Sequence, residues 1–156
     1  MLLLDGVQDP GNLGTLLRTA AALRFDAACL LPGCCDAFNA KAVRAARGAC
    51  FRLPLWRATW SQLAALADAS KATVLGADPR GDPNAATAAA AAAAKPDAPP
   101  LWLALGAEGP GLSVQAQAVC TPVSIPRAGA MRCRFADAAS ACCLDVSVTR
   151  QVAWRA

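Results

Sequence analysis

The fold of the chain can be predicted from its first stretch, Met1-Leu-Leu-Leu-Asp-Gly-Val-Gln-Asp-Pro-Gly-Asn-Leu-Gly-Thr-Leu-Leu-Arg18. Met1 to Leu4 is a short apolar run interrupted by Asp5-Gly6, which is typical of a buried strand followed by a turn. Over residues 12–24, leucine and alanine recur at helical spacing, and Asn12 can cap that helix. The stretch therefore predicts a strand, a glycine-containing turn and a helix, with functional residues at the end of the strand.

The same alternation continues along the chain. Further strands are predicted at 27–31, 50–55, 72–76, 101–105 and 123–125, and further helices at 37–47, 61–68, 112–119 and about 140–154. Strands that alternate with helices indicate one α/β domain over residues 1–156, with a largely parallel sheet and helices on both faces. The segment of about 81–100 is expected to be a low-complexity surface loop, because its alanine run lacks a large apolar stripe and is flanked by prolines.

Composition excludes several classes of function. The chain has no histidine, which removes Ser-His-Asp and Cys-His relays as well as imidazole metal ligands. No window approaches the ~18–20 continuous apolar residues of a membrane span. The net charge of +4 is compatible with a nucleic-acid partner. The eight cysteines lack CxxC spacing, so small buried or loop thiols are expected, with a zinc or redox role as the alternative.

Two glycine-containing stretches are candidates for a site. In the first, Asp9 to Arg18, the start of the helix can receive a phosphate and Arg18 can contact a phosphate or a ribose; the alternative is an asparagine cap and a solvated arginine. The second, Gly106-Ala-Glu-Gly-Pro-Gly111, follows a predicted strand. It is neither a dinucleotide fingerprint nor a lysine-bearing phosphate loop, which makes a dinucleotide or triphosphate site improbable.

Taken together, these motifs resemble the SpoU (TrmH-type) branch of the SPOUT RNA methyltransferases. Asp9-Pro-Gly-Asn-Leu-Gly-Thr-Leu-Leu-Arg-Thr-Ala20 looks like the first family motif, Leu105-Gly-Ala-Glu-Gly-Pro-Gly-Leu112 like the second, and the segment 41–49 is similar to the family's connecting segment. The resemblance implies a C-terminal trefoil knot that holds S-adenosylmethionine, and a homodimer. It also implies methyl transfer to a ribose 2′-hydroxyl of tRNA or rRNA, in a reaction that needs no metal. From the sequence itself we expect an intracellular protein, in the cytoplasm or in an organelle (chloroplast or mitochondrion), with no membrane partner.

The resemblance also assigns residues. It gives Arg18, Asn12, Cys143 and Asp145 to the catalytic site, and Leu105, Gly106, Glu108, Gly109, Ile125, Pro126 and Leu144 to the cofactor. Independently of the resemblance, the basic residues Arg18, Arg44 and Arg47 are expected to form a face that binds RNA; the alternative is that these charges are only solvated. Asn12 is expected to position Arg18.

The third motif departs from the family. Cys143 replaces a serine, Asp145 replaces an asparagine, and the loop before them is longer than usual. A knotted RNA-binding homodimer with weak or no catalysis is therefore the alternative function.

Overall fold

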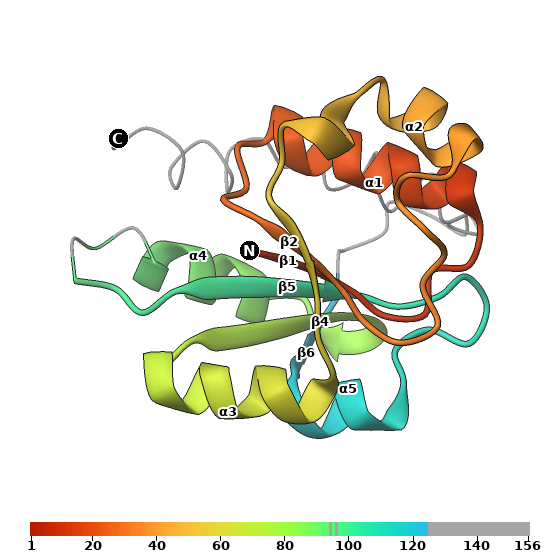
Figure 1. Cartoon of the computed structure of the whole chain (residues 1–156). Coiled ribbons are helices and arrows are strands. Elements are labelled where there is room, and N and C mark those ends of the chain that lie inside the picture. Colours follow the sequence, from red (N-terminus) through yellow and green to blue (C-terminus); the bar gives the residue numbers. More distant parts are fainter. Residues whose placement is uncertain (94, 96, 125–156) are drawn as a thin grey trace.

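The computed structural model describes residues 1–93, 95 and 97–124 (Figure 1). The predicted trefoil knot, the helix at 140–154, and the site residues Ile125, Pro126, Cys143, Leu144 and Asp145 lie outside the described residues.

The described elements form an α/β fold. In chain order they are β1 (Leu2–Leu4), α1 (Pro10–Ala22), β2 (Ala28–Leu30), α2 (Ala40–Ala46), the 3-10 helix η1 (Ala49–Phe51), β3 (Leu55–Arg57), α3 (Trp60–Ser70), β4 (Thr73–Asp82), α4 (Ala85–Ala93), β5 (Leu101–Leu105), α5 (Val114–Val119) and β6 (Thr121–Val123). The strands make a six-stranded sheet in the order β3-β2-β1-β5-β4-β6. Every pairing in it is parallel, which confirms the predicted parallel sheet.

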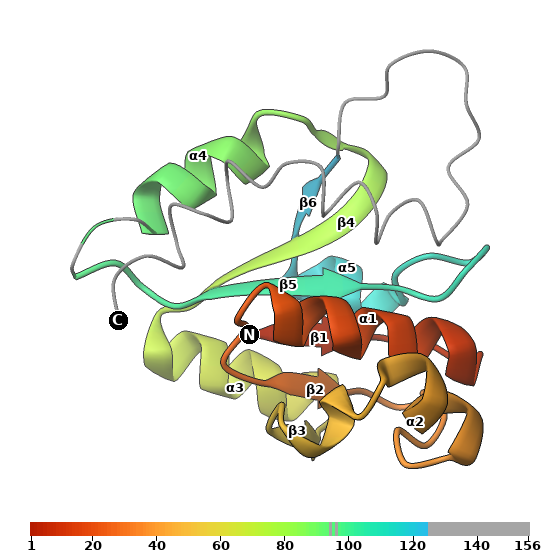
Figure 2. The same cartoon turned by 90° about the horizontal axis from the view of Figure 1, so that it is seen from above.

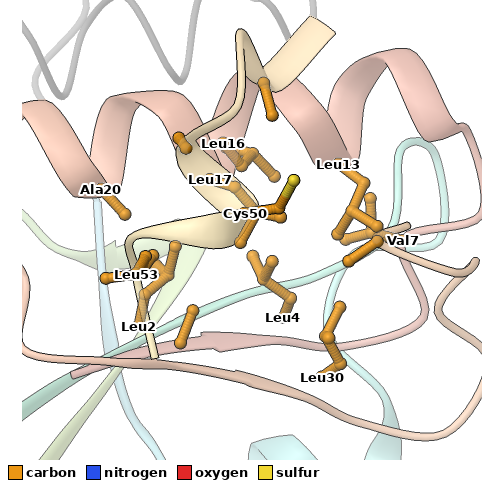
Figure 3. Close-up of a cluster of buried hydrophobic side chains, with 14 residues drawn as sticks. Leu2, Leu4, Val7, Leu13, Leu16, Leu17, Ala20, Leu30, Cys50 and Leu53 are labelled. Carbon is orange, nitrogen blue, oxygen red and sulfur yellow. The ribbon is translucent and has the colours of Figure 1, made fainter. Parts of the chain in front are cut away.

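Helices cover both faces of the sheet, as predicted. Figure 1 shows α1 and α2 on one face and α3 and α5 on the other. Successive side chains of a strand point to opposite faces. Leu2 and Leu4 accordingly pack under α1 in the cluster shown in Figure 3, whereas Leu3 packs against α3 and α5 with Trp102. The sheet is therefore buried on both sides.

A glycine sets the distance between α1 and α2. A Cβ atom on Gly14 would lie 2.3 Å from the carbonyl oxygen of Ala42 and 2.7 Å from the Cβ atom of Ala45. These separations are far shorter than van der Waals contact, so the two helices can pack this closely only because residue 14 has no side chain. Figure 2 shows the two helices side by side.

The third predicted strand, 50–55, is wrong over most of its length. Residues 49–51 form η1, and β3 begins only at Leu55. A short apolar run cannot distinguish a buried strand from a buried helical turn. Cys50 and Leu53 are buried in the cluster under α1, so the run packs there instead of pairing with β2.

The predicted loop over 81–100 also needs correction. β4 continues to Asp82, and the alanine run forms α4. Alanine has the highest helix propensity, and its small side chain lets a helix approach a sheet without a stripe of large residues. Ala90 is buried, which shows that α4 packs against its neighbours. Within the described part of the chain, no helix is long and apolar enough to cross a membrane.

Candidate active site

The two glycine-containing motifs follow β1 and β5, which are neighbours in the centre of the sheet. From β1 the chain moves outward to β2 on one side, and from β5 it moves to β6 on the other side. Parallel α/β sheets bind ligands outside the carboxyl ends of their strands, at the place where the strand order reverses. The loops after β1 and β5 occupy that place.

A buried carboxylate holds this edge of the sheet together. Asp5 follows β1, and its backbone N–H donates to the carbonyl oxygen of Leu105 at 2.9 Å. Its side chain, only 5% exposed, accepts hydrogen bonds from Trp60 Nε1 at 3.0 Å and from the backbone N–H of Ser113 at 2.8 Å. Asp5 thereby ties the first residue of α3 and the N-cap residue of α5 to the central strands.

The second motif forms a tight loop between β5 and α5. Ala107 and Gly111 exchange two backbone hydrogen bonds of 3.0 Å, which close the loop around Glu108 and Gly109. A Cβ atom on Gly106 would lie 2.2 Å from the carbonyl of Gly111, so this close approach requires glycine. The loop therefore presents backbone groups and the exposed Glu108 side chain beyond the end of β5.

One hydrogen bond joins the two motifs. Asn12 Nδ2 donates to Glu108 Oε2 at 3.2 Å, although the two residues are 96 positions apart in the chain. Close by, an ideal Cβ atom on Gly6 would lie 3.8 Å from the Cβ atom of Ala107. The structure thus brings together Asn12, Glu108 and the glycine loop, as expected of parts of one site.

Asp9, not Asn12, caps α1, which corrects the sequence prediction. Asp9 Oδ2 accepts from the Asn12 backbone N–H at 2.8 Å, and Oδ1 accepts from Lys41 Nζ at 3.0 Å. The backbone N–H of Asn12 and, second, the Lys41 ammonium hold the pKa of the Asp9 carboxyl below its ordinary value. Because Asp9 takes the capping role, the Asn12 side chain is available to Glu108.

Arg18 lies on α1, six residues beyond Asn12 and therefore about 9 Å further along the helix. Its side chain is exposed and makes no hydrogen bond or ion pair with the other described residues. The positioning of Arg18 by Asn12 stays a prediction, since the Asn12 amide donates to Glu108. Arg44, on α2, and Arg47, its C-cap residue, are also exposed, on the helix that packs against α1.

Most of the described cysteines are buried or hydrogen-bonded inside the fold. Cys34 donates from Sγ to the carbonyl of Leu4 at 3.1 Å and accepts from the Val7 backbone N–H at 3.3 Å. Burial raises the pKa of the Cys34 thiol, that of Cys29 to about 11 and that of Cys120 to about 12. These thiols stay protonated at neutral pH and are poor nucleophiles. Among the described residues, no group of three potential metal ligands comes together.

A cavity of about 310 Å³ lies beside the motifs, at the carboxyl ends of β2 and β3. Gly33, Cys34, Arg57 and Thr59 are among the residues that line it. It contains none of the predicted site residues. The described part of the predicted site is therefore formed by the two loops and lies outside this cavity.

Comparison with known sequences then identifies the family. The SpoU rRNA Methylase family matches residues 1–144 of the chain. The chain belongs to the SpoU rRNA methylase family. The sequence resemblance is thereby confirmed, and the two loops that Asn12 and Glu108 join both lie within the matched residues.

Individual relatives match a shorter part of this SpoU chain. The 23S rRNA (guanosine(2553)-2′-O)-methyltransferase RlmP of Bacillus subtilis is 54% identical over 57 residues, which are 36% of this chain and 23% of that protein. The human mitochondrial rRNA methyltransferase 3 is 47% identical over 55 residues, 35% of this chain and 13% of that protein.

Solved structures match nearly the whole SpoU chain. The SpoU methyltransferase AviRb of Streptomyces viridochromogenes, in complex with AdoMet, superposes with a TM-score of 0.77 at 28% identity over 99% of this chain and 58% of its own. The AdoMet-bound rRNA methyltransferase of Sinorhizobium meliloti gives 0.76 at 28% identity over 99% and 56%. The chain thus spans little more than half the length of these proteins.

Sequence reasoning missed the residues that support the SpoU motifs. The sequence pattern marks Asp5 only as part of a turn and does not indicate a role for Trp60 or Ser113. The one available signal was an ionisable residue placed directly after an all-apolar strand. A carboxylate there either stays in water or finds donors inside the fold, and here it finds two.

Proposed function

We propose that this chain is an S-adenosylmethionine-dependent RNA methyltransferase that modifies a ribose 2′-hydroxyl of rRNA or tRNA and works as a homodimer. The observation that carries the proposal is the hydrogen bond between Asn12 and Glu108, which unites the two SpoU motifs at the strand ends where such sheets bind ligands. Relatives from bacteria and mitochondria support a location inside a cell or an organelle.

The described residues fit their share of a cofactor site. S-adenosylmethionine supplies a methyl group on a sulfonium, together with a nucleoside that needs hydrogen-bond partners and apolar contact. Leu105 is partly exposed at the end of β5, next to the backbone groups of the loop from Gly106 to Gly111. Glu108 accepts from Asn12 with one carboxylate oxygen, and the other has no hydrogen-bond partner among the described residues, so it can accept from a hydroxyl or ammonium donor.

Arg18 is proposed to bind the RNA. Its guanidinium carries donors suited to the phosphate beside the target ribose, and it is exposed on α1, the helix that Asp9 caps. The reaction requires the 2′-hydroxyl to be oriented and to lose its proton. Because an arginine has a pKa above ~12, Arg18 accepts that proton only in an unusual local field; otherwise solvent takes it.

The cofactor and the reaction are tested separately. Calorimetry with S-adenosylmethionine or S-adenosylhomocysteine should show binding to the purified chain. The absence of any heat of binding at millimolar concentration would contradict the proposal. Transfer of a labelled methyl group to bulk RNA should be lost in Arg18→Ala. The matched control is Arg80→Ala, since Arg80 is exposed and, among the described residues, forms its ion pair with the nearby Asp78; this variant should keep activity.

The alternative, a non-catalytic RNA-binding homodimer, is favoured by one feature of the sequence: Cys143 and Asp145 replace the serine and asparagine of the family pattern. Cysteine is a weaker hydrogen-bond donor, and aspartate loses the donors of the amide. The double variant Cys143→Ser with Asp145→Asn should raise methyl transfer if these replacements weaken catalysis. Sedimentation velocity on the unmodified chain tests the dimer.

A further inference from the structure

Two phenylalanine rings lie together on the surface. Phe38 is 55% exposed and Phe51 is 69% exposed, and their ring centroids are 5.8 Å apart. Phe38 precedes Asn39, the N-cap residue of α2, and Phe51 ends η1, so the two ends of one short segment bring the rings together. An apolar pair that stays in water gives the fold little stability, and such contiguous exposure is typical of an interaction surface.

The positive charge of the chain is concentrated on the same segment. Residues 38–57 contain five basic residues and no acidic one, which leaves ten basic and eleven acidic residues in the rest of the chain. Two of the five have acidic partners: Lys41 pairs with Asp9 and Arg57 with Asp36. Arg44, Arg47 and Arg52 form no salt bridge with any residue that the structure describes.

Arg52 and Arg44 belong to the parts of the segment that carry the rings. Arg52 directly follows Phe51, and Arg44 Nε donates to the carbonyl of Ala40 at 3.3 Å, so its side chain turns back toward the start of α2, where Phe38 lies. Because α2 packs on α1 through Gly14, one helical turn before Arg18, the segment adjoins the candidate site. Figure 2 shows this side-by-side arrangement of the two helices.

We propose that Phe38 and Phe51 form a stacking platform for an unpaired base of the substrate RNA, while Arg44, Arg47 and Arg52 hold its phosphates. This rests on the proposed function and deepens it, since it predicts a single-stranded or loop region at the target. Unpaired RNA offers flat base faces and phosphates together, which match two exposed rings on a segment that also carries arginines without an ion pair among the described residues. A second copy of the chain matches less well, because a symmetric contact would set these positive charges against each other.

The test is fluorescence anisotropy with the full chain and two labelled RNAs, a hairpin with an unpaired loop and a fully paired duplex. The double variant Phe38→Leu with Phe51→Leu keeps apolar bulk but removes the flat rings. It should bind the hairpin about tenfold more weakly and the duplex unchanged. The slope of log affinity against log salt concentration should stay the same, because no charge is removed. The double variant Phe38→Trp with Phe51→Trp, which again has flat rings at both positions, should bind the hairpin about as tightly as wild type.

The matched controls are Leu66→Ala and Val114→Ala, which alter exposed apolar residues on α3 and α5, on the other face of the sheet. They should leave both affinities unchanged. Equal losses for hairpin and duplex in the leucine variant, or no loss, would overturn the platform. So would a wild-type chain that binds neither RNA at low salt. A leucine variant that changes from dimer to monomer and keeps its RNA affinity would assign the rings to a contact between copies instead.

Calorimetry with S-adenosylmethionine on the same variants separates this inference from the proposed function. A chain that binds the hairpin through its rings but binds no cofactor keeps the platform and loses the methyltransferase proposal. A chain that binds the cofactor, and whose RNA affinity does not depend on the rings, keeps the methyltransferase proposal and loses the platform.

Discussion

At the scale of single residues, the described part of the chain has one buried charged side chain, Asp5. It lies outside both motifs, yet it accepts hydrogen bonds from Trp60 and from the start of α5. A buried carboxylate costs free energy unless donors replace its water. Its two donors therefore make Asp5 a support for the loop that carries Glu108, because that loop ends at Ser113.

Asp5→Asn is expected to lower the free energy of unfolding by about 1–3 kcal/mol, because the amide NH₂ must face one of two donors and leave it without an acceptor. Urea denaturation followed by circular dichroism measures the loss. The same variant should bind S-adenosylmethionine more weakly, since the loop loses its anchor. Asp26→Asn, a change at an exposed aspartate, serves as control. A variant as stable as wild type would show that Asp5 has no such role.

Asp9 provides a prediction about pH. Its pKa in the folded chain lies below the ordinary value of 3.8, first because of the Asn12 backbone N–H and then because of Lys41. A group with a lowered folded pKa stabilises the fold above its unfolded pKa, and this contribution is lost as the pH falls through the folded value. Asp9 is also the N-cap residue of α1, and it is 45% exposed.

Asp9→Ala should therefore reduce stability at pH 7 by about 1 kcal/mol or less, and the difference from wild type should shrink below about pH 3.8. Asp9→Asn keeps the capping oxygen and loses the charge, so its stability at pH 7 should lie between that of wild type and that of Asp9→Ala. Thermal unfolding across a pH series gives the comparison. A difference that stays constant into acid would mean that the charge of Asp9 contributes nothing.

At the scale of elements, the sequence predicts the type and order of most strands and helices, because their apolar periodicity is strong. It fails where two structures suit the same residues. The run from Cys50 packs under α1 as a helical turn instead of pairing, and alanines that lack an apolar stripe still form α4. Tertiary contacts decide both cases, and a single sequence does not display them.

Gly14→Ala tests how α1 and α2 fit together. Alanine favours a helix over glycine by about 1 kcal/mol, so propensity alone predicts stabilisation. The new Cβ atom would meet the backbone oxygen of Ala42 at 2.3 Å, and overpacking of this kind typically costs about 1–3 kcal/mol. We expect a net loss of stability, measured by urea denaturation.

Thr15→Ala is the control for this change, since Thr15 neighbours Gly14 on α1 and its hydroxyl donates to the carbonyl of Gly11 within the same helix. Thr15→Ala should change the free energy of unfolding only slightly. If Gly14→Ala proved more stable than wild type, α2 would have to shift away from α1 at no cost.

At the scale of the whole molecule, the site is built from residues far apart in sequence. The motifs could be predicted because each is continuous and close to the family pattern, and the parallel order of the sheet brings them to one edge. Their supports, Asp5, Trp60 and Ser113, come from three separate segments and meet only in the fold. Contacts of that kind leave no local pattern in a sequence.

The distribution of charge leads to a prediction for the whole molecule. The net charge is +4, but the five basic residues of 38–57 exceed it, so the salt-dependent part of RNA binding should depend mainly on this surface, beside the contact proposed for Arg18. Replacing Arg44, Arg47 and Arg52 by glutamine removes three charges from it. For single-stranded RNA the slope of log affinity against log salt should fall by about 2, because each phosphate contact contributes about 0.7.

The control removes the same total charge elsewhere, with Arg24, Lys71 and Lys95 replaced by glutamine. All three are exposed and lie outside the segment. The two variants have the same net charge as each other. If RNA binding depended only on the total charge, both variants would bind RNA equally weakly. Fluorescence titrations at several salt concentrations decide between the two. Equal slopes would show that RNA responds to the overall charge, whereas a lower slope confined to the first variant would locate the phosphate contacts beside Phe38 and Phe51.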